Sequence, residues 1–342
     1  MLNDGILDEA FARFAKTGPE FGPGLANHGP MGADSLVALG RPDAVQTWST
    51  WYVPRLREPA SARKAIAPDE WREALGQIER VADWVLFFER ALAATPWADV
   101  VEQWVARLAP GAMAAHGVLR TAHAVRALDR GATPARVHEL AEGLGYWAAR
   151  YQELPGRHIR NGRLRVAEAL GRVQRLSPEA DRRGLFTTVV NQVGTTTDFE
   201  PVIDLVWPEI PLGEFISDLT NVFVREYLAN ATHSSIAFIH TVTAPSSLRF
   251  LEPHLSTDTG RSIMLHMWQS CAAMEAAFAR TPTASVSVDG GVFDEEDLIA
   301  QTVDARDEHA IKFVEACLRE YRLSGNPEFI AAIRDVVKRV RS

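Results

Sequence analysis

The sequence predicts an all-α protein folded as a multi-helical globular bundle. Apolar residues recur with the helical period through almost every long segment, Pro and Gly breaks separate these segments, and strand-like runs are scarce. With 46% hydrophobic residues, 9 Trp and 15 Phe, the chain of 342 residues can fill a sizeable core, which excludes a disordered protein. We expect a single domain over residues 1–342, with a soft boundary near 157–163, a basic stretch that contains Gly162.

Start and stop signals place the helices of the first half. Pro42 and Asp43 follow Arg41 at one start, and Thr133 with Pro134 forms an N-cap followed by a proline in the first turn. The expected helices are Leu2–Phe14, Asp43–Arg55, one that opens at Pro68–Trp71, Ile78–Ala93, Ala98–Leu108, Ala112–Leu128 and Ala135–Gln152.

The second half is also predicted to be helical. Its expected helices are Arg163–Leu176, Arg182–Val193, Glu214–Ala229, His233–Phe250, Gly260–Arg280, Glu295–Arg306, Asp307–Arg322 and Glu328–Val340. The plausible strands are two short segments, Thr187–Val190 and Ala284–Val288.

Composition excludes several classes of protein. Two cysteines allow at most one disulfide, which favours a reducing interior. The net charge of −8 without a basic block argues against a nucleic-acid partner. No apolar run approaches the roughly 20 residues of a membrane span, and the acidic, amphipathic start is unlike a secretory signal. We therefore expect a cytoplasmic protein with no membrane partner; its oligomeric state stays open.

The common catalytic motifs are absent from the sequence. It contains no G-x-G-x-x-G after a predicted strand, no P-loop, no H-E-x-x-H, no G-x-S-x-G and no paired E-x-x-H. Two isolated cysteines cannot build a zinc ribbon. The ten histidines are the remaining candidates for a reactive site.

Three histidines of the first half lie in settings that suit a site. His28 lies in Phe21–Pro30, a loop dense in Gly and Pro that lets the backbone approach a ligand closely. His116 and His123 share one face of the helix Ala112–Leu128, about 10 Å apart along its axis. Small and cationic neighbours leave space there, as in a cavity wall. A structural role, as a turn residue or a hydrogen-bonded core side chain, stays open for each.

Two further histidines lie in the second half. His240 closes an apolar run, so burial should keep its imidazole neutral, the form that ligates metals; a core role stays open. Pro245 predicts that the helix kinks or ends beside it. His309 and Lys312 lie three residues apart on the helix Asp307–Arg322. The helical period places Lys312 opposite the apolar stripe and so predicts a solvated lysine.

Short blocks that contain these histidines are spread over nearly the whole chain. They are Asn27–Met31, His116–His123, Glu139–Ala141 with Tyr146–Ala148, Leu154-Pro155, Phe238–Ser246 and His309–Lys312. In this order and spacing the blocks resemble the questin oxidase-like family. The resemblance implies an oxygenase of aromatic polyketide metabolism that oxidises or opens a ring of an anthraquinone-type substrate, by formal Baeyer–Villiger or dioxygenase chemistry.

The same resemblance implies a metal site. It implies a non-haem iron ion, Fe²⁺, held by histidines and, in part of the family, by a lysine carboxylated at its amine. Carried onto this chain, the implied ligands are His28, His116, His240, His309 and a carboxylated Lys312, with His123 as a reserve ligand or a catalytic neighbour. Imidazole suits iron, and a carbamate supplies the anionic oxygen that four neutral imidazoles lack. Forming the carbamate requires a desolvated amine, which conflicts with the solvated Lys312 predicted above.

Other residues have two open interpretations. Arg120, one turn from His116, either binds a phenolate or quinone oxygen of the substrate or forms an internal salt bridge. Six aromatic residues either wall the substrate pocket or fill the core: Trp48, Trp51, Tyr146, Trp147, Phe238 and Trp268.

Three hypotheses for function follow, in order of preference. The first is a metal-dependent oxygenase that acts with O2 on a polycyclic phenol or quinone. The second is an oxygenase without metal, which uses NADPH or the substrate carbanion and takes His28 or His116 as general base. The third is a helical carrier that binds an aromatic ligand without changing it.

Overall fold

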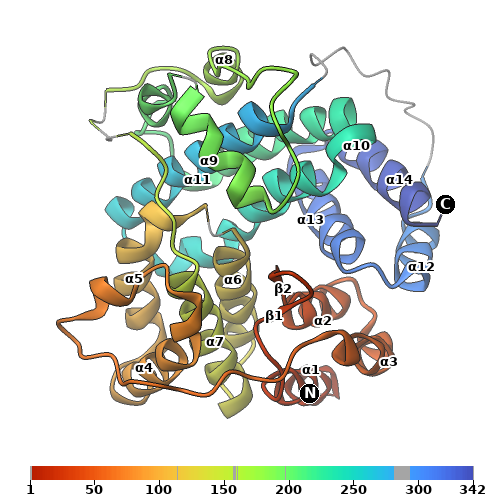
Figure 1. Ribbon diagram of the computed structural model, residues 1–342. Helices are drawn as coiled ribbons and strands as arrows, with labels where there is room; N and C mark the ends of the chain where they lie inside the picture. The colour runs from red at the N-terminus through yellow and green to blue at the C-terminus, as the bar shows by residue number, and fades with distance from the viewer. Residues whose placement is uncertain are drawn as a thin grey trace.

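The computed structural model describes residues 2–113, 115–156, 159, 161–196, 198–280 and 293–341. Within these ranges the chain forms fourteen α-helices, six 3-10 helices and one ribbon of two short antiparallel strands, which confirms the all-α prediction (Figure 1). The α-helices are α1 (Leu2–Phe14), α2 (Gly29–Ala38), α3 (Pro42–Tyr52), α4 (Val81–Ala94), α5 (Trp97–Leu108), α6 (Ala115–Asp129), α7 (Pro134–Ala149), α8 (Val166–Leu170), α9 (Phe186–Thr196), α10 (Leu212–Leu251), α11 (Thr257–Phe278), α12 (Glu295–Ala305), α13 (Glu308–Ser324) and α14 (Glu328–Arg341). The strands β1 (Glu20–Phe21) and β2 (Leu25–Ala26) form a hairpin.

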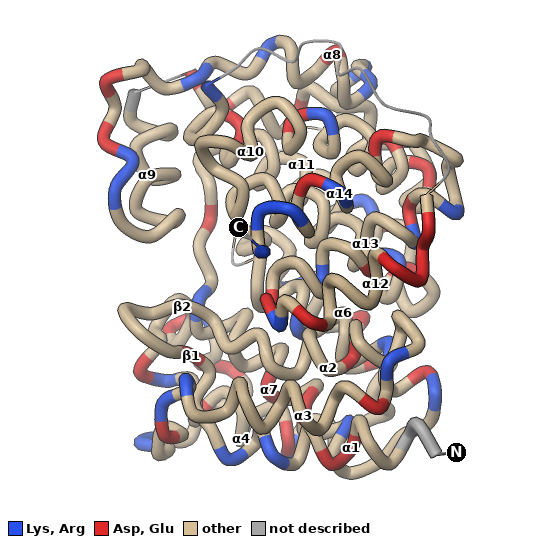
Figure 2. Tube along the Cα trace, turned by 90° about the vertical axis from the view of Figure 1, so that its right-hand side faces the viewer, with Lys and Arg blue, Asp and Glu red and all other residues tan. Residues whose placement is uncertain are grey.

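The long helix α10 is the centre of the fold. It packs against α6, α11, α13 and α14. Helices α4 to α7 form one group of packed helices, and α1 to α3 form a second group that contacts α6, α7 and α13 through α1 and α2 (Figure 1). The β1–β2 hairpin projects on the same side of the molecule as α9 (Figure 2). This arrangement brings α2, α6, α10 and α13 together although they are far apart in the sequence.

Helix α10 unites the two predicted helices Glu214–Ala229 and His233–Phe250. The backbone leaves helical geometry at Ser234 (φ −150°, ψ 46°), the second residue of the second predicted segment. Of the two outcomes expected from Pro245, the ending of the helix beside His240 is wrong, because the helix continues through the proline to Leu251. A proline leaves the carbonyl four residues earlier without its helical donor. That carbonyl belongs to Thr241, and it faces the Cys271 Sγ at 3.8 Å.

Several predicted elements differ from the observed ones. The expected strand Thr187–Val190 lies inside α9, where Val189, Val190 and Val193 are buried at helical spacing. The helix expected over Arg163–Leu176 is only α8. The helix expected to open at Pro68–Trp71 is a 3-10 turn, Trp71–Ala74. Helix α2 and the hairpin were not predicted, and Ala284–Val288 lies outside the described residues.

Two glycines let α6 and α7 approach closely. A Cβ atom on Gly117 would lie 2.4 Å from the Trp147 Cα, and one on Gly143 would lie 2.8 Å from the Thr121 backbone nitrogen. Such distances are far below van der Waals contact, so only glycine fits at this crossing. The close approach brings the first turn of α6, which carries His116, against α7.

The start of α13 is set by its cap. The Asp307 carboxylate accepts hydrogen bonds from the backbone N–H groups of His309 (2.9 Å) and Ala310 (2.8 Å). An aspartate in this position satisfies amide groups that have no partner within the helix. The cap therefore fixes the turn that carries His309 and, one turn later, Lys312.

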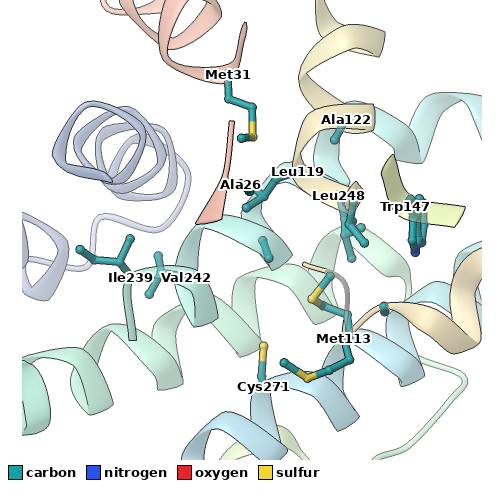
Figure 3. Close-up of a cluster of buried hydrophobic side chains, with 14 of the residues drawn as sticks. Ala26, Met31, Met113, Leu119, Ala122, Trp147, Ile239, Val242, Leu248 and Cys271 are labelled. Atoms are coloured by element: carbon teal, nitrogen blue, oxygen red, sulfur yellow. The ribbon is translucent and has the colours of Figure 1, made fainter. Parts of the chain in front are cut away.

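A single apolar core lies between these helices. Figure 3 shows side chains from the hairpin (Ala26), α2 (Met31), α6 (Leu119 and Ala122), α7 (Trp147), α10 (Ile239, Val242 and Leu248) and α11 (Cys271) converging on it. Five of the six aromatic candidates lie in this core or at the surface. Four of them are buried in the core, namely Trp48, Trp147, Phe238 and Trp268, and Trp51 is exposed. Acidic and basic residues are interspersed along the helices (Figure 2). No described helix combines the length and apolar character that crossing a bilayer requires.

We expect Gly117→Ala to destabilise the protein by about 1–3 kcal/mol, because the added methyl group forces α6 away from α7. Urea unfolding at pH 7 measures the effect. The control is Gly5→Ala in α1, where nothing lies within 4 Å of the added carbon and the helix propensity of alanine predicts a gain of up to about 1 kcal/mol. Equal stability of the two variants would contradict the proposed tight crossing.

Candidate metal centre

Four histidines reach one site from four different elements. His28 stands at the N-terminus of α2, directly after β2, and its backbone N–H donates to the Tyr52 hydroxyl at 3.1 Å. His116 lies in the first turn of α6, His240 in the second half of α10, and His309 in the first turn of α13. The four histidines are far apart in the sequence, and helix packing rather than a local motif brings them together.

The imidazole rings are close enough to share one ion. The ring centroid of His28 lies 4.8 Å from that of His116 and 4.5 Å from that of His309. The ring centroids of His116 and His240 are 4.5 Å apart. The His240 Nε2 and His116 Nε2 atoms are separated by 2.8 Å. Two nitrogens bound to one metal at about 2.1 Å and at right angles lie about 3 Å apart. The observed spacing therefore fits a shared cation.

The tautomer of His240 supports the same arrangement. Its Nδ1 lies 2.7 Å from the Ile236 carbonyl oxygen. A carbonyl only accepts hydrogen bonds, so Nδ1 carries the proton and Nε2 presents its lone pair to the other histidines. Metal-binding histidines commonly donate their second N–H to a backbone carbonyl in this way.

Burial keeps the four imidazoles neutral. His28 and His240 are 2% and 4% exposed, and His116 and His309 are half-buried at the wall of a cavity. Burial is the main cause that lowers the pKa of each ring, with Lys312 adding a repulsive charge; for His240 the pKa falls to about 3. All four rings are therefore in the form that binds a metal at pH 7.

Lys312 joins this cluster, and the prediction that it is solvated is wrong. The residue is 1% exposed, and its Nζ lies 3.3 Å from the His28 Nδ1. Helix α13 packs against α10 and α14 and also against α2, so the face opposite its apolar stripe is covered as well. Burial lowers the pKa of the Lys312 amine to about 8, while the nearby Glu308 and Asp307 carboxylates oppose the shift.

A carboxylate near the histidines was missed by the sequence reasoning. Oxygen and nitrogen atoms of Glu308, His28 and His309 lie within 4.8 Å of one another. Glu308 is 5% exposed and forms a salt bridge of 3.1 Å with Arg55. Its position next to His309 in the sequence was the available signal.

His123 and Arg120 lie outside the cluster. The His123 Nδ1 lies 2.8 Å from the Asp34 carboxylate, and Arg126 bridges Asp34 (2.7 Å) and Glu315 (2.7 Å). This buried network joins α2, α6 and α13, three of the four elements that carry the clustered histidines. His123 is thus hydrogen-bonded within the core and does not line the cavity.

Arg120 belongs to a second buried ion pair. Its Nε and Nη2 donate to the two carboxylate oxygens of Glu139 at 2.5 and 2.8 Å, and Glu142 lies 3.3 Å away. Arg120 is absent from the cavity lining, so of its two interpretations the structure places it in the internal salt bridge.

The histidine cluster opens into a cavity of about 650 Å³. Apolar and sulfur-containing side chains from α9, α10 and α11 form much of its wall, together with Met113 and the hairpin. Among the six predicted aromatic candidates, Tyr146 lines it; the other lining aromatics are Phe21, Tyr151 and Phe186. The wall also contains Met113, Met267, Met274, Cys271, Thr241 and Ser270. A cavity of this size and composition suits a flat aromatic ligand.

The fold and site therefore define an all-α protein with a histidine cluster at the wall of an apolar cavity. Residues 27–317 match the family described as Questin oxidase-like, and the chain belongs to this family. Membership implies an oxidoreductase of the oxygenase kind that acts on a small molecule. No curated protein matches the sequence.

The network around His123 predicts how acid affects stability. Burial lowers the pKa of His123 from 6.5 to about 4, with Asp34 opposing the shift. Between pH 6.5 and 4 the unfolded chain binds a proton at His123 that the native protein does not, so the free energy of unfolding falls as pH falls. This loss reaches about 3 kcal/mol at pH 4 and is absent above pH 6.5.

We therefore expect His123→Gln to reduce the slope of stability against pH between pH 7 and 5 by the share of one imidazole, measured by urea unfolding of the metal-free protein. The four clustered histidines, whose pKa values are also lowered, keep the rest of the slope. The exposed His233 offers the control substitution, His233→Gln, at a residue outside this buried network. An unchanged slope in His123→Gln would show that this imidazole is not held neutral by the fold.

Proposed function

We propose that this protein is an oxygenase that uses O2 to oxidise or cleave a ring of an anthraquinone-type aromatic polyketide. The proposed cofactor is Fe²⁺, and the residues that would hold it are His28, His116, His240, His309 and Lys312, the last as its carbamate. When bound, the ion supplies redox chemistry with O2 and Lewis-acid activation of a ring oxygen.

The observation that carries this proposal is the convergence of four neutral imidazoles at the wall of an apolar cavity. The Nε2 atoms of His240 and His116 lie 2.8 Å apart, and the His240 Nε2 carries a lone pair once its proton is on Nδ1. Without an ion, a proton on the His116 Nε2 fills this gap as an N–H···N hydrogen bond. A shared cation would take the place of that proton and accept both lone pairs.

Lys312 supplies what the imidazoles lack. Four neutral ligands leave the charge of a buried dication uncompensated. The neutral amine of Lys312 can add to CO2, which forms a C–N bond and releases one proton to solvent, and the product is a carbamate with one negative charge. Burial favours this reaction because it lowers the pKa of the amine to about 8.

The cavity wall binds and orients the substrate. Thioether groups of Met113, Met267 and Met274 offer soft, polarisable contacts to aromatic rings. The Thr241 and Ser270 hydroxyls lie on the same wall, but each donates to a backbone carbonyl of its own helix, to Phe238 and His266. The wall therefore favours a flat, largely apolar ring system.

Metal binding gives the first test. We expect protein reconstituted anaerobically with Fe²⁺ and desalted to retain about one equivalent of iron. His240→Ala should lower the affinity at least about tenfold, measured by chelator competition, because it removes a ligand whose tautomer is already set. The matched control is His233→Ala at the surface, with unchanged affinity.

The reaction itself is tested by O2 consumption and product analysis with a hydroxyanthraquinone. Retention of less than about a tenth of an equivalent of metal would contradict the metal site. Activity that survives chelation and requires NADPH would support the metal-free oxygenase instead. Recovery of unchanged ligand despite tight binding would support the carrier.

Lys312 has its own prediction. In ¹³C NMR spectra of metal-loaded protein supplied with ¹³C-bicarbonate, we expect a carbamate resonance that Lys312→Met abolishes. The same substitution should weaken Fe²⁺ binding about 10- to 100-fold, because an anionic ligand is lost. Lys338→Met, at an exposed lysine of α14, is the control and should keep both signals. Wild-type metal affinity without a carbamate resonance would exclude the modification.

A further inference from the structure

Two arginines among the described residues line the cavity, and their surroundings differ. Arg55 ends the short 3-10 helix Val53–Arg55, and Arg150 follows α7. Each faces a carboxylate that is itself buried: Glu308 for Arg55 and Glu20 for Arg150. The two side chains are about one-third exposed, at 37% for Arg55 and 33% for Arg150. Both are therefore reachable from the cavity.

Arg150 is committed to holding the hairpin. Its Nε donates to the Glu20 Oε1 at 2.7 Å, its Nη2 contacts the same oxygen, and the Tyr146 hydroxyl donates to that oxygen at 3.1 Å. Glu20 lies in β1, so this cluster fastens the β1–β2 ribbon to α7. A ligand that drew Arg150 away would leave a buried carboxylate without its cation, which is costly.

Arg55 is held in a fixed orientation but uses fewer of its N–H groups in hydrogen bonds than Arg150 does. Its guanidinium carbon lies 5.4, 5.1 and 5.2 Å from the ring centroids of Phe21, Trp51 and Tyr52. Cation–π contacts of this kind hold the guanidinium in place without using its N–H groups. Among the described residues its hydrogen-bond acceptor is the Glu308 Oε2, at 3.1 Å from Nη1. A guanidinium has five N–H donors, so several are available to a ligand in the cavity.

The position of Arg55 relates it to the histidine cluster. Its partner Glu308 lies within 4.8 Å of nitrogen atoms of His28 and His309. A ligand oxygen that approaches Arg55 from the cavity is therefore beside the clustered rings. This is the location that the sequence reasoning gave to Arg120, which the structure instead buries against Glu139.

We infer that Arg55 is the specificity-determining residue of the cavity: it binds an ionised oxygen of the aromatic substrate, phenolate or carboxylate, and turns that edge toward the histidine cluster. The inference rests on the proposed function only for the identity of the ring system. It predicts a preference for ionised over neutral aromatic ligands, and this preference requires neither turnover nor O2.

The experiment compares ligands that differ in one ionisable group. The probes are a monohydroxyanthraquinone and an anthraquinone carboxylic acid, each with its methyl ether or methyl ester as the neutral counterpart. Affinities are measured anaerobically by tryptophan fluorescence quenching, at a pH at which the free acid is ionised. The absorption band of the bound phenol, which moves to longer wavelength on ionisation, reports its charge directly.

We expect at least one acid to bind wild-type protein about 10- to 100-fold more tightly than its neutral counterpart. Which acid shows the preference distinguishes phenolate from carboxylate. Arg55→Gln should abolish the preference and leave the affinity of the neutral ligand unchanged, and Arg55→Lys should retain part of it. The double variant Arg55→Gln with Glu308→Gln removes the unpaired carboxylate and should show no preference either.

Arg150→Lys is the matched control, which keeps the charge beside Glu20 and should keep the preference. The inference is overturned if wild type shows no preference, if Arg55→Gln retains it, or if Arg55→Gln weakens acid and neutral ligand equally. These outcomes are separate from those for the proposed function. O2 consumption with a preference that survives Arg55→Gln refutes the role of Arg55 alone, and a lost preference in a protein without oxygenase activity refutes the oxygenase alone.

Discussion

The uncharged state of a buried group of imidazoles is the constraint on which the rest of the site depends. Each proton added to His28, His116, His240 or His309 would place a desolvated charge beside other basic groups, and burial lowers the pKa of every ring for this reason. The lone pairs of neutral rings can then face one another. The fold sustains this state because the helices that carry the rings are covered on several sides.

Charged residues behind the cluster hold these helices in register. Asp34 of α2, Arg126 of α6 and Glu315 of α13 form a buried network, with His123 as an additional partner of Asp34. A network of this kind is costly to leave incomplete, so it favours one relative placement of three helices. The close glycine contact between α6 and α7 additionally fixes the position of α6, whose first turn carries His116. Stability and ligand geometry thus have a common source.

The cavity combines an apolar wall with charge at one location. Sulfur-containing and aromatic side chains surround most of the space, whereas Arg55 and Glu308 lie beside the histidines. A flat ring system gains contact area from the wall, and an ionised substituent gains a partner from the guanidinium. Membership in the questin oxidase-like family agrees with a small aromatic substrate of this shape.

The sequence by itself determined the helical class, most helix positions and the identity of the clustered histidines. Helical periodicity and caps such as Thr133 are local signals, so they survive without knowledge of the fold. The histidines were found because His28 lies in a Gly- and Pro-rich segment and the others lie in blocks that resemble a family. Short elements were predicted less well: α2 and the hairpin were missed, and the strand expected at Thr187–Val190 is part of a helix. The conformation of such short segments depends on the elements that pack against them.

Only the tertiary structure decided which polar residues meet. Periodicity distinguishes two faces of a helix but does not show that α13 is covered on both, so Lys312 was expected in solvent and lies beside His28. The same reason applies to Arg120: sequence distance put it near His116, whereas packing turns it toward Glu139. Packing also brings Arg55, far away in the chain, to the cavity. Burial and contacts between distant segments arise when helices pack, and no local pattern encodes them.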